Sequence, residues 1–368
     1  MTRRLVVVHN NIDQRSAIGK LALWATKVAL EAGYRVVAVA KDIDASLKAD
    51  VEYVPLHVPR AVFAYQWARA RSTVKAALAD VSYDILHTYQ AQLIGVADTW
   101  HVCFLTRSAE QTGSFPQGRD LLSQWRNSQL RAVAAMEDRY LRQVTSNVKV
   151  LFPRQLMLDE FTRLYGEPPR HEILPNPVGA SIEVTEDERR QARRDFVGPF
   201  DGIVVGYLGG MDDRKGWREL TDAIAGTTNT FLLFGGTGSQ TFRDWRVTER
   251  CRTFGYVEDL TGFLAACDVL AVPSKFDPNP QVVSDAAARG VPSIITPMVG
   301  TLEQVLKHGA GVSWDGSPDT FPAVIRDFAD RRSDLAAGAN RMARALSERS
   351  VSERLVRSWA EALEFRQR

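Results

Sequence analysis

Residues 275–295 read KFDPNPQVVSDAAARGVPSII and follow an apolar run, Val269 to Val272. The pattern predicts a buried strand, a Pro/Asn-rich turn, a short Ala-rich helix that stops at Gly290, and a second buried strand. Strands that alternate with helices in this way form parallel sheets covered by helices on both faces. The stretch therefore predicts an α/β fold.

The same stretch carries two carboxylates, Asp277 and Asp285, which lie eight positions apart and bracket the turn and the helix. Asp277 lies just before the helix N-terminus, where free backbone N–H groups and the helix dipole attract anions. A carboxylate beside an anion site is suited to accept hydrogen bonds from hydroxyl groups of a ligand that also carries phosphate. Sugar nucleotides are ligands of this kind.

The rest of the chain alternates between strands and helices in the same way, which predicts two doubly wound halves. The expected strands are Leu5 to His9, Arg35 to Ala40, Ile85 to Thr88, Cys103 to Thr106, Val148 to Phe152, Ile203 to Leu208, Thr230 to Phe234, Thr253 to Phe254, Val269 to Val272 and Ser293 to Thr296. The expected helices include Lys20 to Ala32, Arg126 to Leu141, Glu183 to Phe196 and Ser352 to Phe365.

A proline-dense stretch, residues 168–178, marks the expected crossing between the halves. We expect an N-terminal domain over residues 1–175, a C-terminal domain over residues 176–350, and a helix over residues 351–368 that packs back toward the N-terminal domain. In doubly wound domains a ligand binds at the carboxyl ends of the strands.

The composition is that of a soluble globular protein, with 45% apolar and 24% charged residues, and the net charge of +2 does not mark a nucleic-acid binder. No apolar run approaches the roughly 18 residues that span a bilayer, and the first four residues lead into a strand rather than a secretory segment. The three cysteines have no metal-ligand spacing and suit reduced thiols. The sequence thus predicts a cytoplasmic protein. Asp42-Ile43-Asp44 has the DxD form but is expected to be a solvated loop, so we predict no metal site.

The two carboxylates and their surroundings resemble the E-x7-E signature of family 4 retaining glycosyltransferases, with Asp in place of both Glu residues. Residues 206–216, GYLGGMDDRKG, are similar to the family's strand followed by G-R-x-x-x-x-K-G. The resemblance implies that Lys215 binds the donor diphosphate. Gly210 stands where the family has Arg, and Arg214 is the nearest cation in sequence that could replace it.

Further stretches resemble the family in the same order along the chain. Gly236-Thr237-Gly238-Ser239 is similar to a G-x-G-x loop, and Gly300-Thr301-Leu302-Glu303 to a Gly-x-x-Glu loop near the donor sugar and phosphates. The resemblance implies that Asp277 holds sugar hydroxyls and Asp285 ribose hydroxyls. The implied set of donor-binding residues is Gly19, Gly210, Gly236, Tyr256, Val257, Asn279, Pro280, Gln281, Asp285 and Glu303, with Asp277, Lys215 and Arg214 as the catalytic set.

The N-terminal half departs from the family pattern at two places. The loop from Asn10 to Lys20 keeps only Gly19 of the usual Gly-Gly pair. The family's His at the end of the strand that matches Cys103 to Thr106 is absent, and His101 lies before that predicted strand. Arg107 and Ser108 follow the strand and are the candidates for the acceptor side.

The resemblance implies a GT-B fold, in which two doubly wound domains face each other across a cleft. It also implies retaining transfer of a hexose from a nucleotide diphosphate sugar, with uridine favoured over guanosine, to an unknown acceptor. No cofactor or metal is expected. Two alternatives stay open: a non-catalytic partner that binds nucleotide sugar, and a phosphorylase or epimerase of similar shape.

The segment from Ala61 to Leu78 mixes aromatic and basic residues, among them Phe63, Tyr65 and Arg69. Such a helix could touch an anionic membrane surface, including the inner membrane. A solvated helix packed on the N-terminal domain is the simpler interpretation.

Overall fold

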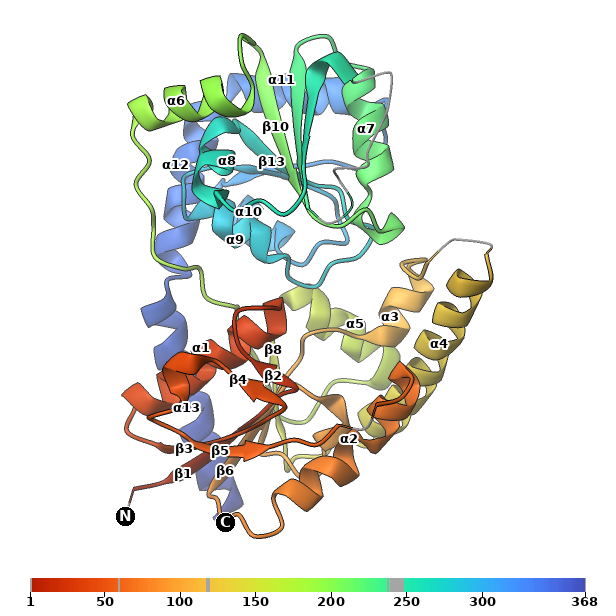
Figure 1. The fold of residues 1–368 in the computed structure, drawn as a ribbon, viewed down its shortest axis with the longest axis vertical. Coiled ribbons are helices and arrows are strands. Elements are labelled where there is room, and N and C mark those ends of the chain that lie inside the picture. The colour runs from red at the N-terminus through yellow and green to blue at the C-terminus, as the bar shows by residue number, and fades with distance from the viewer. Residues whose placement is uncertain (1, 59, 117–119, 237, 239–247, 368) are drawn as a thin grey trace. The chain divides into compact units, whose positions relative to one another are not determined.

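The computed structural model describes residues 2–58, 60–116, 120–236, 238 and 248–367. The chain forms two compact units (Figure 1). The first comprises Met1–Gln111, Gly118–Asn176 and Arg349–Arg368, and the second comprises Thr112–Gln117 and Pro177–Glu348. The main boundary follows Asn176, one residue from the boundary predicted at 175/176.

The first unit is built on a seven-stranded parallel sheet. Its order is β5 (Glu52–Pro55), β3 (Arg35–Ala40), β1 (Arg4–Val8), β6 (Ile85–Thr88), β7 (Thr99–His101), β8 (Lys149–Phe152) and β9 (His171–Ile173). A separate two-stranded sheet joins β2 (Asn11–Ile12) to β4 (Asp42–Ile43). The run Leu5 to Val8 is completely buried, as expected for a central strand covered on both faces.

Helices cover both faces of this sheet. Leu5 and Val7 share a core cluster with α1 and α13, whereas Val6 and Val8 share another with Val74 of α2. The helices of the unit are α1 (Ala17–Glu31), α2 (Phe63–Ala77), α3 (Thr106–Gln111), α4 (Leu121–Leu141), α5 (Gln155–Tyr165) and α13 (Glu348–Arg366).

The second unit has a six-stranded parallel sheet. Its order is β12 (Cys251–Phe254), β11 (Thr230–Gly235), β10 (Ile203–Leu208), β13 (Val269–Val272), β14 (Ser293–Ile295) and β15 (Gly311–Ser313). Its helices are α6 (Glu186–Phe196), α7 (Trp217–Ala225), α8 (Leu260–Ala266), α9 (Gln281–Ala287), α10 (Leu302–His308), α11 (Phe321–Asp330) and α12 (Arg332–Ala345). Two core clusters lie on opposite faces of this sheet, so both units are doubly wound and Rossmann-like.

The strand predicted at Cys103 to Thr106 is wrong. The strand is β7, and it ends at His101, which lies inside the sheet rather than before a strand. Thr106 instead begins α3, where the carboxylate of Glu137 accepts hydrogen bonds from Thr106 N at 2.8 Å and from its Oγ1 at 2.9 Å. A short apolar run has no periodicity of its own, so this distant carboxylate fixes the helix start.

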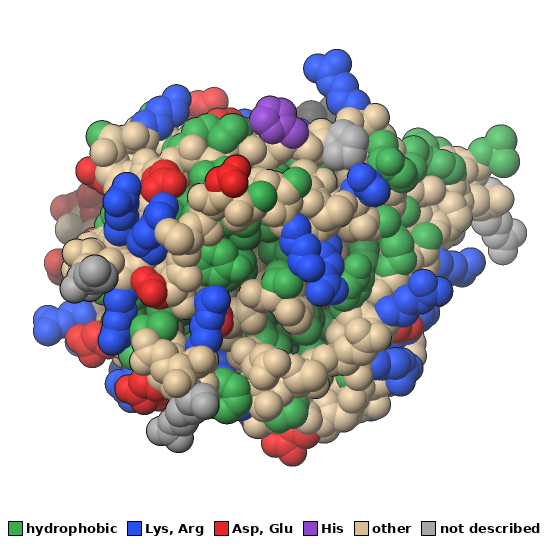
Figure 2. Space-filling view, turned by 90° about the horizontal axis from the view of Figure 1, so that it is seen from below, with side chains coloured by type: hydrophobic (Ala, Val, Ile, Leu, Met, Phe, Trp, Pro, Cys, Tyr) green, Lys and Arg blue, Asp and Glu red, His purple; other side chains and the backbone are tan. Residues whose placement is uncertain are grey.

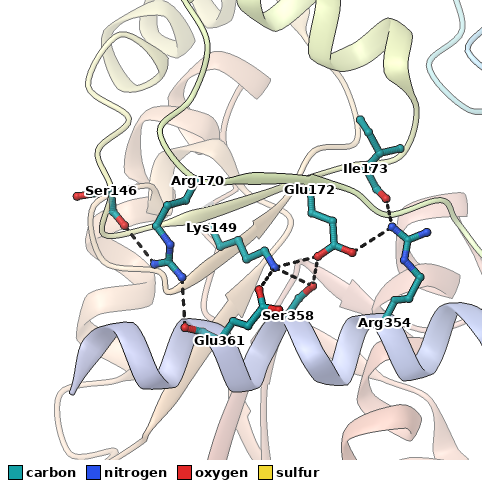
Figure 3. A network of polar contacts seen from close by, with 8 residues as sticks. All are labelled: Ser146, Lys149, Arg170, Glu172, Ile173, Arg354, Ser358 and Glu361. Carbon is teal, nitrogen blue, oxygen red and sulfur yellow. Dashed lines mark hydrogen bonds and ion pairs between the residues drawn. The ribbon is translucent and has the colours of Figure 1, made fainter. Parts of the chain in front are cut away.

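A polar network joins α13 to the sheet of the first unit (Figure 3). Lys149 Nζ on β8 lies 2.9 Å from Glu172 Oε2 and 2.6 Å from Glu361 Oε2. Glu172 also accepts from Ser358 Oγ at 2.7 Å and from Arg354 Nη2 at 3.0 Å. Burial favours the protonated form of Glu172, but the bonds from Ser358 and Lys149 outweigh it and lower its pKa. The C-terminal helix is therefore tied to the first unit by charge as well as by apolar packing.

Two buried histidines in the first unit make its stability depend on pH. His87 and His101 are completely buried, with ring centroids 6.4 Å apart. Burial lowers the pKa of His101 to about 4 and also lowers that of His87. The unfolded chain binds these protons near pH 6.5, so the free energy of unfolding falls as the pH drops from 6.5 toward 4. The shift at His101 alone corresponds to about 3 kcal/mol.

Glu137 acts in the opposite direction, because burial raises its pKa to about 7. Its contribution to stability is present below pH 4.5 and is lost as the pH rises toward 7. Urea unfolding at several pH values between 4 and 6.5 should show a smaller loss on acidification for His101→Phe than for the wild type. Glu137→Gln should show a larger loss. An unchanged pH dependence in His101→Phe would contradict the assignment.

The helix expected within residues 61–78 is α2, which buries Val74 and receives a hydrogen bond from α4, Ala64 N to Gln129 Oε1 at 3.2 Å. Phe63 and Tyr65 stay about half exposed. Charges of both signs, with apolar side chains between them, occupy the face seen in Figure 2. Among the described residues, no helix has the length and apolar character to cross a membrane. Membrane contact through α2 stays a prediction.

Candidate functional site

The site predicted from residues 206–285 lies at the carboxyl edge of the second sheet. The chain runs from β10 outward to β11 and β12, and then returns to β13 on the other side of β10. The order of strands thus reverses between β10 and β13, where open parallel sheets bind their ligands. The loop that follows β10 carries Arg214 and Lys215, and the loop that follows β13 carries Asp277.

Lys215 and Asp277 meet across this point although 62 positions separate them in the sequence. Lys215 Nζ lies 2.6 Å from Asp277 Oδ2, and the Asp277 residue is only 7% exposed. Arg214 Nη1 lies 3.7 Å from the same oxygen and donates to Phe276 O at 3.0 Å. One buried carboxylate therefore has two cations beside it.

The loop after β10 is held in a fixed shape. The Asp212 side chain accepts from Arg214 N and begins a short 3₁₀ turn over Asp213–Lys215. Gly216 ends the turn in the left-handed region at φ 66°, and a Cβ there would lie 1.9 Å from Pro273 O. The residue must be glycine, because the two loops touch at this point. Tyr207 Oη donates to Gly210 O at 2.8 Å and fixes the start of the loop.

Asp277 is positioned by its own backbone. Its N–H donates to Met298 O at 3.1 Å, and its C=O accepts from Gly300 N at 2.9 Å. These bonds bring the loop before α10 against the Asp277 turn, with Glu303 exposed in the first turn of α10. The buried Nδ2 and Oδ1 of Asn279 have no hydrogen-bond partner among the described residues, and the same is true of Thr301 Oγ1. The site therefore keeps unused polar groups next to Asp277.

The other predicted residues of the second unit lie at the same edge of its sheet. Pro280 is the N-cap of α9, which contains Gln281 and Asp285. Gly236 follows β11, and a Cβ there would lie 2.1 Å from Gly209 O, so close loop packing explains this glycine. Tyr256 follows β12 and is 88% exposed, with Val257 beside it. Thr237 and Ser239 lie outside the described residues.

Gly210 differs from its neighbouring glycines. A Cβ at this position would meet no described heavy atom within 4 Å, and its φ is not in the left-handed region. The position is therefore open to a side chain, and its glycine has no steric reason in this structure.

The predicted residues of the first unit take part in local contacts. Gly19 lies in the first turn of α1, where its N–H donates to the N-cap Ser16 Oγ at 3.0 Å. Arg107 Nη2 lies 2.7 Å from Asp138 Oδ2 and also contacts Glu110. Ser108 is completely buried and donates to Glu160. These contacts support α3 and α1, and the proposed roles of the three residues stay predictions.

The DxD segment also has structural partners. Asp42 Oδ2 lies 2.6 Å from Arg15 Nη2, and the Asp44 side chain accepts from Ser46 N at the start of a short 3₁₀ turn. No group of three or more side chains suited to hold a metal ion occurs within the described residues. Sequence reasoning missed Tyr207 and Thr301 as supports of the site, since a Tyr in a strand and a Thr in a loop carry no distinctive signal.

The comparisons with known proteins agree with this geometry. Residues 202–331 match the family described as glycosyl transferases group 1. The matched segment contains Arg214, Lys215 and Asp277.

Two curated relatives match over parts of the chain. The lipopolysaccharide core biosynthesis glycosyltransferase LpsE of Rhizobium meliloti is 32% identical over 104 residues, which cover 27% of this chain and 31% of LpsE. A glycogen synthase of Mycobacterium tuberculosis is 29% identical over 218 residues, covering 54% of this chain and 48% of the synthase. The chain thus spans half or less of the length of these relatives.

Solved structures resemble the chain over almost its whole length. WaaG, a glycosyltransferase involved in lipopolysaccharide biosynthesis, gives a TM-score of 0.76 at 17% identity, covering 95% of this chain and 98% of WaaG. Anabaena Alr3699/HepE, solved in complex with UDP-glucose, gives a TM-score of 0.69 at 15% identity, covering 98% of this chain and 100% of that one. At these identities the likeness establishes the fold, which is of the GT-B type.

Proposed function

We propose that this protein is a retaining glycosyltransferase that moves a hexose from a nucleotide diphosphate sugar to an acceptor hydroxyl. The observation that carries the proposal is the group of Lys215, Arg214 and Asp277 where the strand order of the second sheet reverses. A departing diphosphate needs cations to stabilise its growing charge, and a sugar needs a fixed acceptor of hydrogen bonds. The group contains both. The match to the glycosyl transferases group 1 family supports the same conclusion.

In this proposal Lys215 and Arg214 bind the diphosphate and stabilise it as it leaves. Asp277 accepts hydrogen bonds from the sugar hydroxyls, assisted by the unused amide of Asn279. Asp285 accepts from the ribose hydroxyls, and exposed Tyr256 offers a face for the base. Glu303 and the loop before α10 border the sugar and phosphates.

Retention follows from attack on the same face from which the diphosphate leaves. The acceptor oxygen forms a bond to the anomeric carbon while the bond from that carbon to the phosphate oxygen breaks. The proton of the acceptor hydroxyl moves to the leaving phosphate. Protein cations can stabilise the diphosphate without a metal ion, so we propose a metal-independent reaction.

Thermal shift with a panel of UDP and GDP sugars, each with and without EDTA, tests donor binding. At 100 times the dissociation constant, a bound donor adds about 2.7 kcal/mol to the free energy of unfolding. We expect a UDP sugar to give the largest shift and EDTA to leave it unchanged. A shift abolished by EDTA would contradict metal independence. Release of nucleotide without transfer to any acceptor would instead support the nucleotide-sugar-binding partner.

Arg214→Ala should lower the rate of transfer at least tenfold, because one of the two cations beside the diphosphate is lost; this is about 1.4 kcal/mol of transition-state stabilisation. Lys215→Ala should cost more. Gly210 has room for a side chain, so Gly210→Arg placed in the Arg214→Ala variant should restore part of the rate. Steady-state kinetics with the best donor measures all three. If Arg214→Ala keeps the full rate, Arg214 is not the second cation.

A further inference from the structure

A second ligand pocket lies in the first unit. The chain runs from β1 outward to β3 and β5, and then returns to β6 on the other side of β1. The strand order therefore reverses between β1 and β6, which is the position where such sheets bind ligands. Asn10 and Gln90 each lie two residues beyond the end of one of these strands, and both line a small enclosed pocket there.

The lining of this pocket is polar but uncharged. Four side-chain amides contribute to it, together with two aromatic rings of α2 and aliphatic side chains that follow β5. No charged side chain is present among the described residues that line it. The amides are those of Asn10, Gln66, Gln90 and Gln92, and the rings are Phe63 and Trp67.

One of these amides has an unused acceptor. Gln90 is 9% exposed, and its Nε2 donates to Asn10 Oδ1 at 3.0 Å. Its buried Oε1 has no hydrogen-bond partner among the described residues. Gln92 is 5% exposed, and its Nε2 reaches Trp67 O only at 3.5 Å. A buried amide oxygen without a donor costs free energy, which a ligand hydroxyl would recover.

We infer that this pocket binds the hydroxyl-bearing edge of an uncharged sugar or polyol. Amides match hydroxyls as both donors and acceptors, and aromatic rings pack against the C–H groups of such ligands. The pocket volume is about 60 Å³, enough for a hydroxymethyl group or a few hydroxyls but not for a whole ring. A phosphate or carboxylate would be buried there without a cation, at a large desolvation cost. The inference rests on the proposed function, under which this ligand is the acceptor.

Ligand-observed NMR on the full chain, without nucleotide, tests the inference. The probes are glucose, galactose, mannose and myo-inositol, each at millimolar concentration, and the charged counterparts are glucose 6-phosphate and glucuronate. We expect at least one neutral probe to bind and the charged counterparts to bind at least tenfold more weakly. Gln90→Leu should weaken that neutral probe at least tenfold, because it removes the amide.

Ala70→Leu is a second variant that fills the pocket from α2 with a good helix former, so the fold should persist even if Gln90→Leu is unstable. Thermal unfolding of each variant reports whether it folds. UDP binding, measured separately, should be unchanged in both variants, because the donor residues lie in the other unit. This separates a failure of the pocket from a failure of the proposed function.

Binding of a neutral probe that both variants leave unchanged would overturn the inference, as would equal binding of glucose and glucose 6-phosphate. Absence of binding by every neutral probe would overturn it as well. Loss of sugar binding in Asp277→Asn, with retention in Gln90→Leu, would place the sugar at the donor site instead.

Discussion

Asp277→Asn is expected to lower the rate of glycosyl transfer at least a hundredfold while nucleotide binding stays within a few-fold of wild type. The carboxylate is buried and lies 2.6 Å from Lys215 Nζ. Its amide replacement keeps the shape but loses the charge-assisted bonds proposed to the sugar hydroxyls, each worth about 1.5–3 kcal/mol. A loss of about 2.7 kcal/mol in the transition state corresponds to a hundredfold in rate.

The free nucleotide should respond differently from the sugar nucleotide. Once Asp277 is neutral, Lys215 and Arg214 are no longer paired to it, and both are available to the diphosphate. Calorimetry with free UDP should therefore give equal or tighter binding in Asp277→Asn, whereas Asp285→Asn should weaken UDP about ten- to a hundredfold. Equal losses of UDP affinity in the two variants would remove the proposed division of roles.

Asp327→Asn is the matched control for both measurements. It makes the same chemical change in the same unit, at a surface carboxylate that pairs only with Arg331 among the described residues, at 2.9 Å. Both side chains of that pair are half exposed, and such pairs contribute about 0–1 kcal/mol to stability. The control should therefore keep wild-type rates and nucleotide affinity. A hundredfold loss in the control would indicate a general effect on the fold.

Lys149→Met is expected to lower the free energy of unfolding by about 3 kcal/mol. The Lys149 side chain is 8% exposed and lies at the centre of the network between β8 and α13 (Figure 3). Without it, the partly buried Glu172 carboxylate loses its closest cation, and the remaining bonds come from Ser358 and Arg354. An uncompensated buried charge costs more than the ion pair contributed, so the loss should exceed that of a surface pair.

Urea unfolding at pH 7 measures this effect, with Arg349→Met as the control on the same helix. Arg349 pairs with Glu353 at 3.3 Å, but their side chains are 91% and 64% exposed, so its loss should cost about 0.5 kcal/mol or less. The double variant Lys149→Met/Glu172→Met should be less destabilised than the two single variants predict together, because no unpaired carboxylate remains at position 172. Strict additivity would argue against a coupled network.

The fold could be predicted largely from the sequence, because central parallel strands are continuous apolar runs that no other element explains. The runs over β3, β6, β10 and β13 were predicted to the residue, and each is buried between two layers of helices. Lys215 and Asp277 could be selected in the same way, since each follows such a strand where ligands bind.

The sequence alone did not place β7 or the start of α3. Residues 102–105 form an apolar run too short to show a period, and Thr106 becomes the start of a helix only because Glu137, 31 positions later, accepts its hydrogen bonds. The same limit applies to Arg107 and Ser108, whose partners on α4 and α5 lie outside any local pattern.

Local pattern thus determined which segments are strands and helices and which loops carry charged groups, because burial of an apolar run depends on neighbours a few positions away. Tertiary structure decided which of those groups meet. The 2.6 Å contact of Lys215 with Asp277 spans 62 positions, and the bond from Gln90 to Asn10 spans 80. Both result from the return of the chain to the centre of a parallel sheet, which brings the ends of β10 and β13, and of β1 and β6, side by side.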